Sequence, residues 1–194
     1  MGMETPDGGG DEKVSRPPQF ADLTALCAEL NRLGARYVVV GGFAMIQHGF
    51  PRFTNDIDLL VETTLENEAR VLEALLSLPD KAAAELKPGE IAQYGVIRVG
   101  DEVMVDLMKS GCGVTYHDAI ADAALEEVDG VRIPFASPLT LWRMKQTVRA
   151  KDAPDRIFLR ELLASRGIEV EPAAPPEGNP LIRWWRRLGT WWQG

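Results

Sequence analysis

The segment of residues 41–61, GGFAMIQHGFPRFTNDIDLLV, most constrains what this chain can fold into. The apolar residues 37–40 precede it and predict a buried strand, and the pair Gly41-Gly42 ends that strand before a short helical pattern. A helix entered in this way directs its unpaired N–H groups and the positive end of its dipole toward the turn. Because two glycines let a ligand approach the backbone closely, we expect a phosphate-binding turn here.

The second half of the segment contributes two carboxylates, Asp56 and Asp58, in a run that continues as Leu-Leu-Val. Residues i and i+2 of a strand share a face, so both carboxylates point to one side while Ile57 and Leu59 enter the core. Neighbouring carboxylates repel unless a cation joins them. Hard oxygen ligands favour Mg²⁺ or Mn²⁺, which commonly bind through one or two carboxylates and the phosphates of a substrate. The segment therefore indicates chemistry on a nucleotide.

This pattern resembles the signature of the nucleotidyltransferase superfamily with the polymerase-β-like fold. Within that superfamily, the chain is similar to the small bacterial proteins grouped with the AbiE-type abortive-infection toxins. The residues that carry the resemblance are Gly41-Gly42, a short helix with His48-Gly49, Arg52-x-Thr54 and Asp56-Ile57-Asp58-Leu59.

The family pattern also includes a third carboxylate on a later strand, which Asp106 in the run Val-Met-Val-Asp-Leu-Met offers. It further includes a lysine-bearing helix followed by Lys-Asp-x-x-Asp, which Lys145 and residues 151–155 match. With these features the resemblance extends over residues 37–163. One departure is that many members carry Gly-Ser at the turn, whereas this chain has Gly42-Phe43.

The resemblance implies metal ligation by Asp56, Asp58 and Asp106, with Mg²⁺ or Mn²⁺ as the cofactor. Asp106 also has support from its neighbours, because a carboxylate between Val105 and Leu107 is costly to bury unless something pairs with it. The alternative is an edge strand whose aspartate faces solvent.

The implied nucleotide-binding residues are Gly41, Gly42, Arg52, Thr54 and Lys145. Alternatively, Arg52 forms an ion pair with Asp56 or with a surface acid. The alternative to nucleotide binding for Thr54 is that it serves only to orient the aspartate strand. A lysine on an amphipathic helix, such as Lys145, is usually solvated. His48 is expected to pack or hydrogen-bond locally, because the mechanism requires no imidazole.

Periodicity predicts an α/β fold, a small mixed sheet flanked by helices with a helical C-terminal portion. The expected helices cover residues 20–33, 65–78, 116–124, 138–148 and 152–165, with Asp152 as an N-terminal cap of the last one. The expected strands are residues 37–40 and 56–61, a hairpin of 94–99 and 102–108 turned at Gly100-Asp101, and a hairpin over 125–135 turned at Asp129-Gly130.

We divide the chain into a disordered leader (1–18), the nucleotidyltransferase domain (19–168), a proline-rich linker (169–180) and an amphipathic Trp/Arg helix (181–194). On that last helix, Leu and Trp side chains share one face and arginines the other, which favours docking on the protein's own domain or a second copy in a homodimer. The alternative is contact with a membrane surface.

Composition narrows the function classes. A formal net charge of -8 argues against a general nucleic-acid coat protein, since lysine and arginine make the phosphate contacts. The 2 cysteines have no paired spacing, so neither a disulfide framework nor a zinc site is expected. With no signal-peptide pattern, we expect a cytoplasmic protein.

Together these features predict an enzyme that moves a nucleoside monophosphate from a nucleoside triphosphate to an acceptor hydroxyl. The toxin-like resemblance implies an RNA end such as that of tRNA, or a protein, as acceptor, and a cognate antitoxin as partner. The alternatives are a small-molecule (antibiotic) nucleotidyltransferase and a non-catalytic nucleotide-binding or protein-interaction module.

Overall fold

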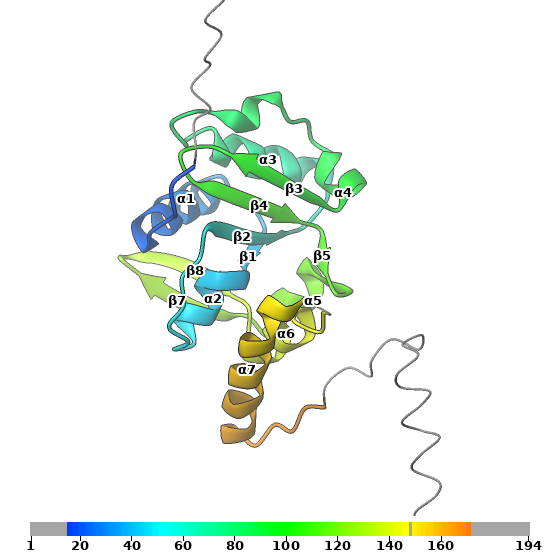
Figure 1. Cartoon of the computed structure of the whole chain (residues 1–194). Coiled ribbons are helices and arrows are strands. Elements are labelled where there is room, and N and C mark those ends of the chain that lie inside the picture. The colour runs from blue at the N-terminus through cyan, green and yellow to red at the C-terminus, as the bar shows by residue number, and fades with distance from the viewer. Residues whose placement is uncertain (1–14, 148, 172–194) are drawn as a thin grey trace, which may run out of the picture.

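The protein is described by a computed structural model that covers residues 15–147 and 149–171 (Figure 1). A six-stranded mixed sheet has the order β3-β4-β2-β1-β8-β7, and β5 and β6 form a separate two-stranded ribbon. The expected fold class, a mixed α/β sheet flanked by helices, is confirmed. In chain order the elements are α1 (Phe20–Arg32), β1 (Tyr37–Val39), α2 (Gly41–Gln47), β2 (Asp56–Val61), α3 (Leu65–Leu75), η1 (Ala82–Glu85), α4 (Glu90–Tyr94), β3 (Val96–Gly100), β4 (Met104–Met108), β5 (Ser110–Gly111), β6 (Val114–Thr115), α5 (Tyr116–Ile120), β7 (Ala124–Val128), β8 (Val131–Phe135), α6 (Pro138–Met144), η2 (Ala150–Asp152) and α7 (Ala153–Ser165).

The centre of the sheet combines antiparallel and parallel pairs. β1 pairs antiparallel with β2 and parallel with β8, and β2 pairs parallel with β4. Val38 lies opposite Leu60 in the β1–β2 pair, and both side chains are fully buried. β1 reads as an apolar run because its residues are all buried, whereas the start of β2 alternates Asp56 and Asp58 with buried apolar residues.

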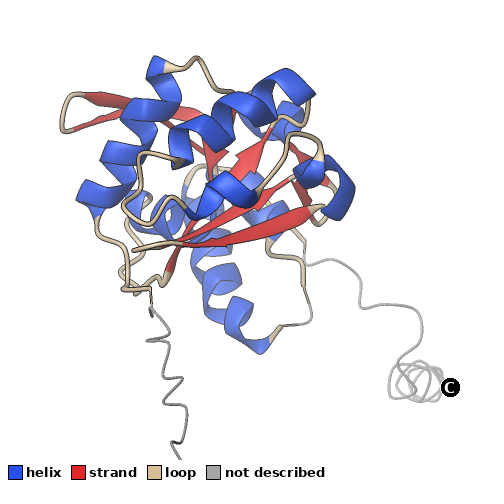
Figure 2. Ribbon diagram, turned by 90° about the horizontal axis from the view of Figure 1, so that it is seen from above, coloured by secondary structure: helices blue, strands red, loops and turns tan. Residues whose placement is uncertain are grey.

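The helices divide between the two faces of the sheet. In the view of Figure 1, α1 and α3 lie side by side behind the sheet, whereas α2 lies in front of it. The helices α6 and α7 pack against each other beside α2, and Figure 2 shows the same layers from above. Within the described residues, the front face next to α2 therefore keeps a part over β2, β4 and β3 that no helix covers, which we call the uncovered part.

The register of the β3–β4 hairpin differs from the predicted one. A two-residue turn at Gly100-Asp101 would place Arg98 opposite Val103, but Gly100 pairs with Met104 across a three-residue loop, so Arg98 lies opposite Asp106. The loop is wider because the buried Asp101 carboxylate accepts hydrogen bonds from the N–H groups of Asp80 and Ala82, at 2.9 Å each. This contact holds the loop on η1.

Several predicted helices are shorter than expected. The helix expected over residues 65–78 ends at Leu75, the one over 116–124 ends at Ile120, and the one over 138–148 ends at Met144. The short elements η1, α4, β5, β6 and η2 were not predicted at all, since two to five residues are too few for a periodic pattern.

Two details of α7 also correct the sequence-based expectations. The apolar pattern of residues 152–165 predicts that Ile157 faces inward, but it is 53% exposed, while Leu159 is fully buried. Asp152 occupies the N-cap position, but its side chain makes no capping hydrogen bond. The carboxylate instead accepts hydrogen bonds from Thr147, Lys145 and Arg149. These hydrogen bonds connect the segment after α6 to the start of α7.

Residues 15–18, at the end of the expected leader (1–18), contact the rest of the domain. Arg16 forms an isolated bridge with Val103, and its guanidinium pairs with Asp22 at 2.6 Å and Glu102 at 3.0 Å. Residues 15–18 therefore connect α1 to the β3–β4 loop. Residues 1–14, most of the predicted linker and the predicted helix at 181–194 lie outside the described residues. No helix within the described part of the chain is long and apolar enough to span a bilayer.

Candidate active site

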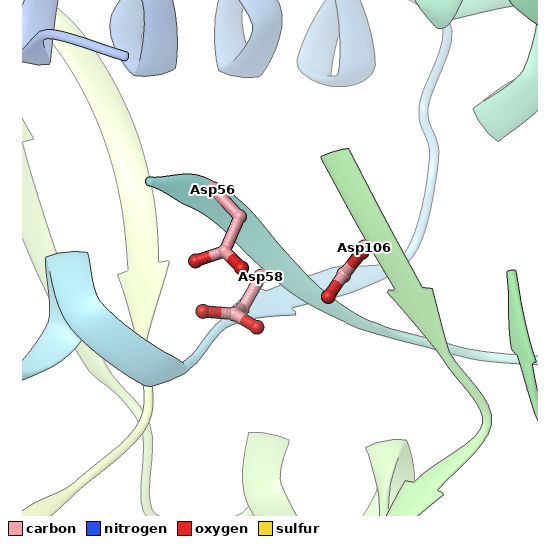
Figure 3. A group of neighbouring side chains, drawn as sticks. All are labelled: Asp56, Asp58 and Asp106. Atoms are coloured by element: carbon pink, nitrogen blue, oxygen red, sulfur yellow. The ribbon is translucent and has the colours of Figure 1, made fainter. Parts of the chain in front are cut away.

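The three predicted metal ligands lie together on the uncovered part of the sheet (Figure 3). Asp56 and Asp58 project from β2, and Asp106 projects from β4, where it lies directly opposite Asp58 in the parallel register. One carboxylate oxygen from each residue lies within 4.8 Å of the others. We refer to these residues as the triad.

Mutual repulsion within the triad is visible in its electrostatics. Burial raises the pKa of Asp58 to about 6, and the negative charges of Asp56 and Asp106 add to this shift. The Gly42 N–H, 3.4 Å from Asp58 Oδ2, and the charge of Lys145 act in the opposite direction. Because the surroundings of Asp58 disfavour its negative charge, a cation bound at the triad would be stabilised there.

The triad fits a small divalent cation. A carboxylate oxygen binds Mg²⁺ at about 2.1 Å, so two oxygens on one ion lie at most about 4.2 Å apart. The 4.8 Å limit that encloses the triad oxygens is close to this value. All three ligands are hard oxygens, which suits Mg²⁺ or Mn²⁺ better than softer metals.

The two glycines of the turn make room for the site's own side chains. A Cβ on Gly41 would lie 1.8 Å from Asp58 Oδ2, and one on Gly42 would lie 2.3 Å from Thr54 Oγ1. Gly41 also has φ +60, a conformation that other residues rarely adopt. The Gly-Gly pair thus allows β2 to place Asp58 against the first turn of α2.

The residues after the glycines serve packing. Phe43, which follows the Gly-Gly pair, is 2% exposed and meets Phe20 of α1 edge to face, with ring centroids 5.1 Å apart. A side chain at this position turns into the core rather than toward a ligand. His48 hydrogen-bonds through Nε2 to the Ala136 carbonyl at 2.8 Å, which confirms its expected local role.

The loop before β2 orients the first aspartate. Thr54 Oγ1 donates toward the Asp56 carbonyl at 3.1 Å and lies 3.3 Å from Asp56 Oδ1. This matches the orienting alternative for Thr54. Among the described residues, Arg52 pairs with the buried Asp155, to which its Nη1 donates at 2.6 Å, rather than with Asp56 or a surface acid.

Lysines on amphipathic helices are usually solvated, but Lys145 is mostly buried. Its side chain is 13% exposed, and its Nζ lies 2.8 Å from Asp155 Oδ2 and 3.1 Å from Asp152 Oδ1. The Lys145 charge also lowers the pKa of Asp58, as noted above, so the ammonium lies near the triad. Asp155 thus holds Arg52 and Lys145 together from two distant parts of the chain.

Arg98 on β3 is a site residue that the sequence analysis missed. Its Nε and Nη2 donate to the two oxygens of Asp106 at 2.7 and 2.6 Å, and Nη2 lies 3.4 Å from Asp56 Oδ2. Hydrogen bonds and charge at Asp106 raise the pKa of Arg98 above its ordinary value. The correct hairpin register would have revealed it, since a three-residue loop sets Arg98 opposite Asp106.

Comparison with known proteins gives distant similarity of structure. An antigenic nucleotidyltransferase-like protein from Paracoccidioides brasiliensis superposes with a TM-score of 0.47 at 17% identity, covering 87% of this chain and 86% of that one. A candidate nucleotidyltransferase from Thermotoga maritima superposes with a TM-score of 0.43 at 13% identity, covering 91% and 98%. No protein-family model and no curated protein matches the sequence. Similarity this distant assigns no function, so the chemistry of the triad has to carry that argument.

Proposed function

We propose that this protein is a metal-dependent nucleotidyltransferase that moves a nucleoside monophosphate from a nucleoside triphosphate to an acceptor hydroxyl. The observation that carries this proposal is the convergence of Asp56, Asp58 and Asp106 on the uncovered part of the sheet. Lys145, whose charge acts on Asp58, supplies positive charge next to this convergence, and Asp155 ties Arg52 to Lys145. Chemistry on a triphosphate requires carboxylates that bind a metal ion and, next to them, basic side chains that bind the phosphates.

Each residue receives a role from its position. Asp56 and Asp58 would hold Mg²⁺ or Mn²⁺ together with Asp106, and the ion would supply charge neutralisation at the attacking and leaving oxygens. Lys145 would bind the phosphate chain, with Arg52 contributing from the same side. We assign the Gly41-Gly42 backbone to the phosphates as well, and Thr54 to the orientation of Asp56.

The reaction forms one P–O bond and breaks another. The acceptor oxygen attacks the α-phosphorus in line, and the bond from the α-phosphorus to the β-phosphate oxygen breaks, which releases pyrophosphate. We assign the hydroxyl proton to Asp106, which contributes its carboxylate from β4 rather than β2. From its position opposite Asp58, Asp106 would thus serve both as a ligand of the ion and as the acceptor of this proton.

For the acceptor we propose the hydroxyl of an RNA end, such as tRNA, or of a protein, in the cytoplasm. The resemblance of Gly41-Gly42, Arg52-x-Thr54 and Asp56-x-Asp58 to AbiE-type toxins supports this choice, and a cognate antitoxin would then be the partner. Transfer to a small molecule such as an antibiotic is the competing outcome.

The test uses the full chain, each α-labelled nucleoside triphosphate in turn, Mn²⁺ or Mg²⁺, and cellular RNA, cellular protein or aminoglycosides. We expect label to enter one fraction with the wild-type protein and with Asp129→Asn. The latter removes one carboxylate from the β7–β8 turn, where φ is +50, a conformation that asparagine adopts readily. Asp58→Asn should reduce transfer by at least about 1000-fold, because it removes a ligand on which the chemistry depends. Equal transfer by Asp58→Asn and Asp129→Asn would refute the proposal, and metal-independent binding without transfer would favour a non-catalytic module.

A further inference from the structure

Arg98 holds the position that a metal ion needs at Asp106. The guanidinium engages both Asp106 oxygens, at 2.7 and 2.6 Å, and reaches Asp56 at 3.4 Å. These two members of the triad are the ion-pair partners of Arg98 in the described part of the chain. A divalent ion bound by Asp106 and Asp56 would therefore meet a positive charge already paired with them.

The strand register of the sheet places Arg98 next to Asp106. Arg98 on β3, Asp106 on β4 and Asp58 on β2 form one row across three neighbouring strands. Two carboxylates directly opposite each other repel, and the arginine at the end of the row offsets this repulsion. Arg98 thus stabilises the triad when it carries no ion.

The exposure of Arg98 allows a metal ion to displace it from the carboxylates. Its side chain is 60% exposed, whereas that of Asp106 is 11% exposed. A partly exposed ion pair contributes little net free energy, so a doubly charged ion can compete for the same oxygens. Once displaced, a guanidinium on this face has an obvious new partner, because it binds phosphate oxygens through two parallel hydrogen bonds.

We propose that Arg98 couples metal binding to triphosphate binding: it competes with the metal for Asp106 and Asp56, and transfers to the phosphates when metal and triphosphate bind together. This inference rests on the proposed function and assigns Arg98 a positioning role in it. A metal ion that binds alone displaces Arg98 and leaves it without a new partner. When the triphosphate binds together with the metal ion, its phosphates become the new partner of Arg98. The two ligands should therefore increase each other's affinity, and by linkage the increase is the same in both directions.

The test compares Arg98→Gln with wild type and with Arg70→Gln. Arg70 is an arginine of α3 whose ion-pair partner is Glu66, outside the triad. Binding of Mn²⁺ alone is measured by calorimetry and electron paramagnetic resonance, and binding of Mn²⁺ with inorganic triphosphate is measured in the same way. Inorganic triphosphate carries the phosphate chain common to every nucleoside triphosphate, so the identity of the base does not matter.

We expect Arg98→Gln to bind Mn²⁺ alone about tenfold more tightly than wild type, and to lose most of the coupling between Mn²⁺ and triphosphate, which typically amounts to about 5–150-fold. Arg70→Gln should behave as wild type. Arg98→Lys, which keeps the charge but loses the two-pronged contact, should also bind Mn²⁺ more tightly than wild type while retaining part of the coupling. It serves as the second variant if the three carboxylates destabilise Arg98→Gln.

The outcomes separate this inference from the proposed function. Mn²⁺ binding that is unchanged or weaker in both Arg98 variants would overturn the role of Arg98, while label transfer by the wild type would leave the proposed function standing. Wild-type protein that binds no Mn²⁺ and transfers no label would overturn both.

Discussion

Gly41 shows most directly how one residue constrains the site. Its backbone has φ +60, and a Cβ at this position would lie 1.8 Å from Asp58 Oδ2. From sequence alone, the expected reason for the two glycines is the close approach of a phosphate. The structure adds a second reason that requires no ligand, because Gly41 and Gly42 leave the space that Asp58 and Thr54 occupy.

Gly41→Ala should therefore damage the triad as well as the backbone. Gly49 provides a matched control, since it also has a positive φ, +92, but an added Cβ would meet nothing within 4 Å. We expect Gly49→Ala to lower the free energy of unfolding by about 1 kcal/mol and Gly41→Ala by about 3 kcal/mol. Urea unfolding measures both, and Mn²⁺ binding should be weakened only in Gly41→Ala. Equal losses in the two variants would mean that Asp58 moves aside without cost.

At the scale of elements, the junction of α6, η2 and α7 is organised by two buried carboxylates. Asp152 is 1% exposed and Asp155 2% exposed, and Lys145 bridges them. Because Arg52 also pairs with Asp155, this junction is tied to the loop before β2. The helical C-terminal portion thus holds its lysine near the triad through ion pairs rather than through apolar packing alone.

The junction should make the protein sensitive to acid. Burial by itself would raise the pKa of Asp152, but hydrogen bonds from Thr147 and Lys145 and the charges of Lys145 and Arg149 outweigh burial and hold the pKa below its ordinary value. A carboxyl group with a depressed pKa in the folded state stabilises above its unfolded pKa, about 3.9, and this contribution is lost as pH falls further.

Asp152→Asn should therefore flatten the pH dependence of stability below about pH 4. We expect the wild type to lose free energy of unfolding more steeply than the variant between pH 4 and the acid limit of folding, as measured by urea unfolding at a series of pH values. Asp129→Asn, at an exposed turn, is the control for removing one carboxylate. Parallel curves for the wild type and Asp152→Asn would contradict the role of this ion pair.

At the scale of the whole molecule, the triad concentrates negative charge at the middle of the sheet of an acidic protein. Three carboxylates lie within 4.8 Å, and the chain carries a formal net charge of -8. Burial raises the pKa of Asp58, and the charges of Asp56 and Asp106 raise it further. An ion that neutralises the triad should therefore stabilise the entire fold.

We expect saturating Mn²⁺ to raise the thermal unfolding midpoint of the full chain. At an ion concentration of about 100 times Kd, ligand binding contributes about 2.7 kcal/mol, or a shift of about 5–10 °C for a domain of this size. Differential scanning fluorimetry with Mn²⁺, and then with excess chelator, measures the shift and its reversal. Asp58→Asn should show little shift at the same ionic strength. A shift of equal size in that variant would place the stabilising ion elsewhere.

Periodicity and turn chemistry were sufficient for much of the fold. Residues 20–32 of α1 and 56–61 of β2 were predicted nearly to the residue, because α1 has a long helical pattern of apolar positions and β2 alternates two aspartates with apolar residues before Leu-Leu-Val. The β7–β8 hairpin was also predicted, since Asp129 and Gly130 both adopt the positive φ of its turn. Local sequence was enough to predict these features because their apolar pattern and turn residues lie within a few positions, although β2 itself pairs with the distant strands β1 and β4.

The tertiary structure decided which side chains meet. The carboxylates of Asp56 and Asp58 share a face by the geometry of one strand, so their sequence spacing was enough to place them together. The contact of Asp106 with Arg98 depends on the β3–β4 register, which a buried Asp101 sets through η1. The link from Arg52 to Asp155 joins residues 103 positions apart. No local pattern encodes such pairs, because their geometry follows only when the whole chain has packed around the sheet.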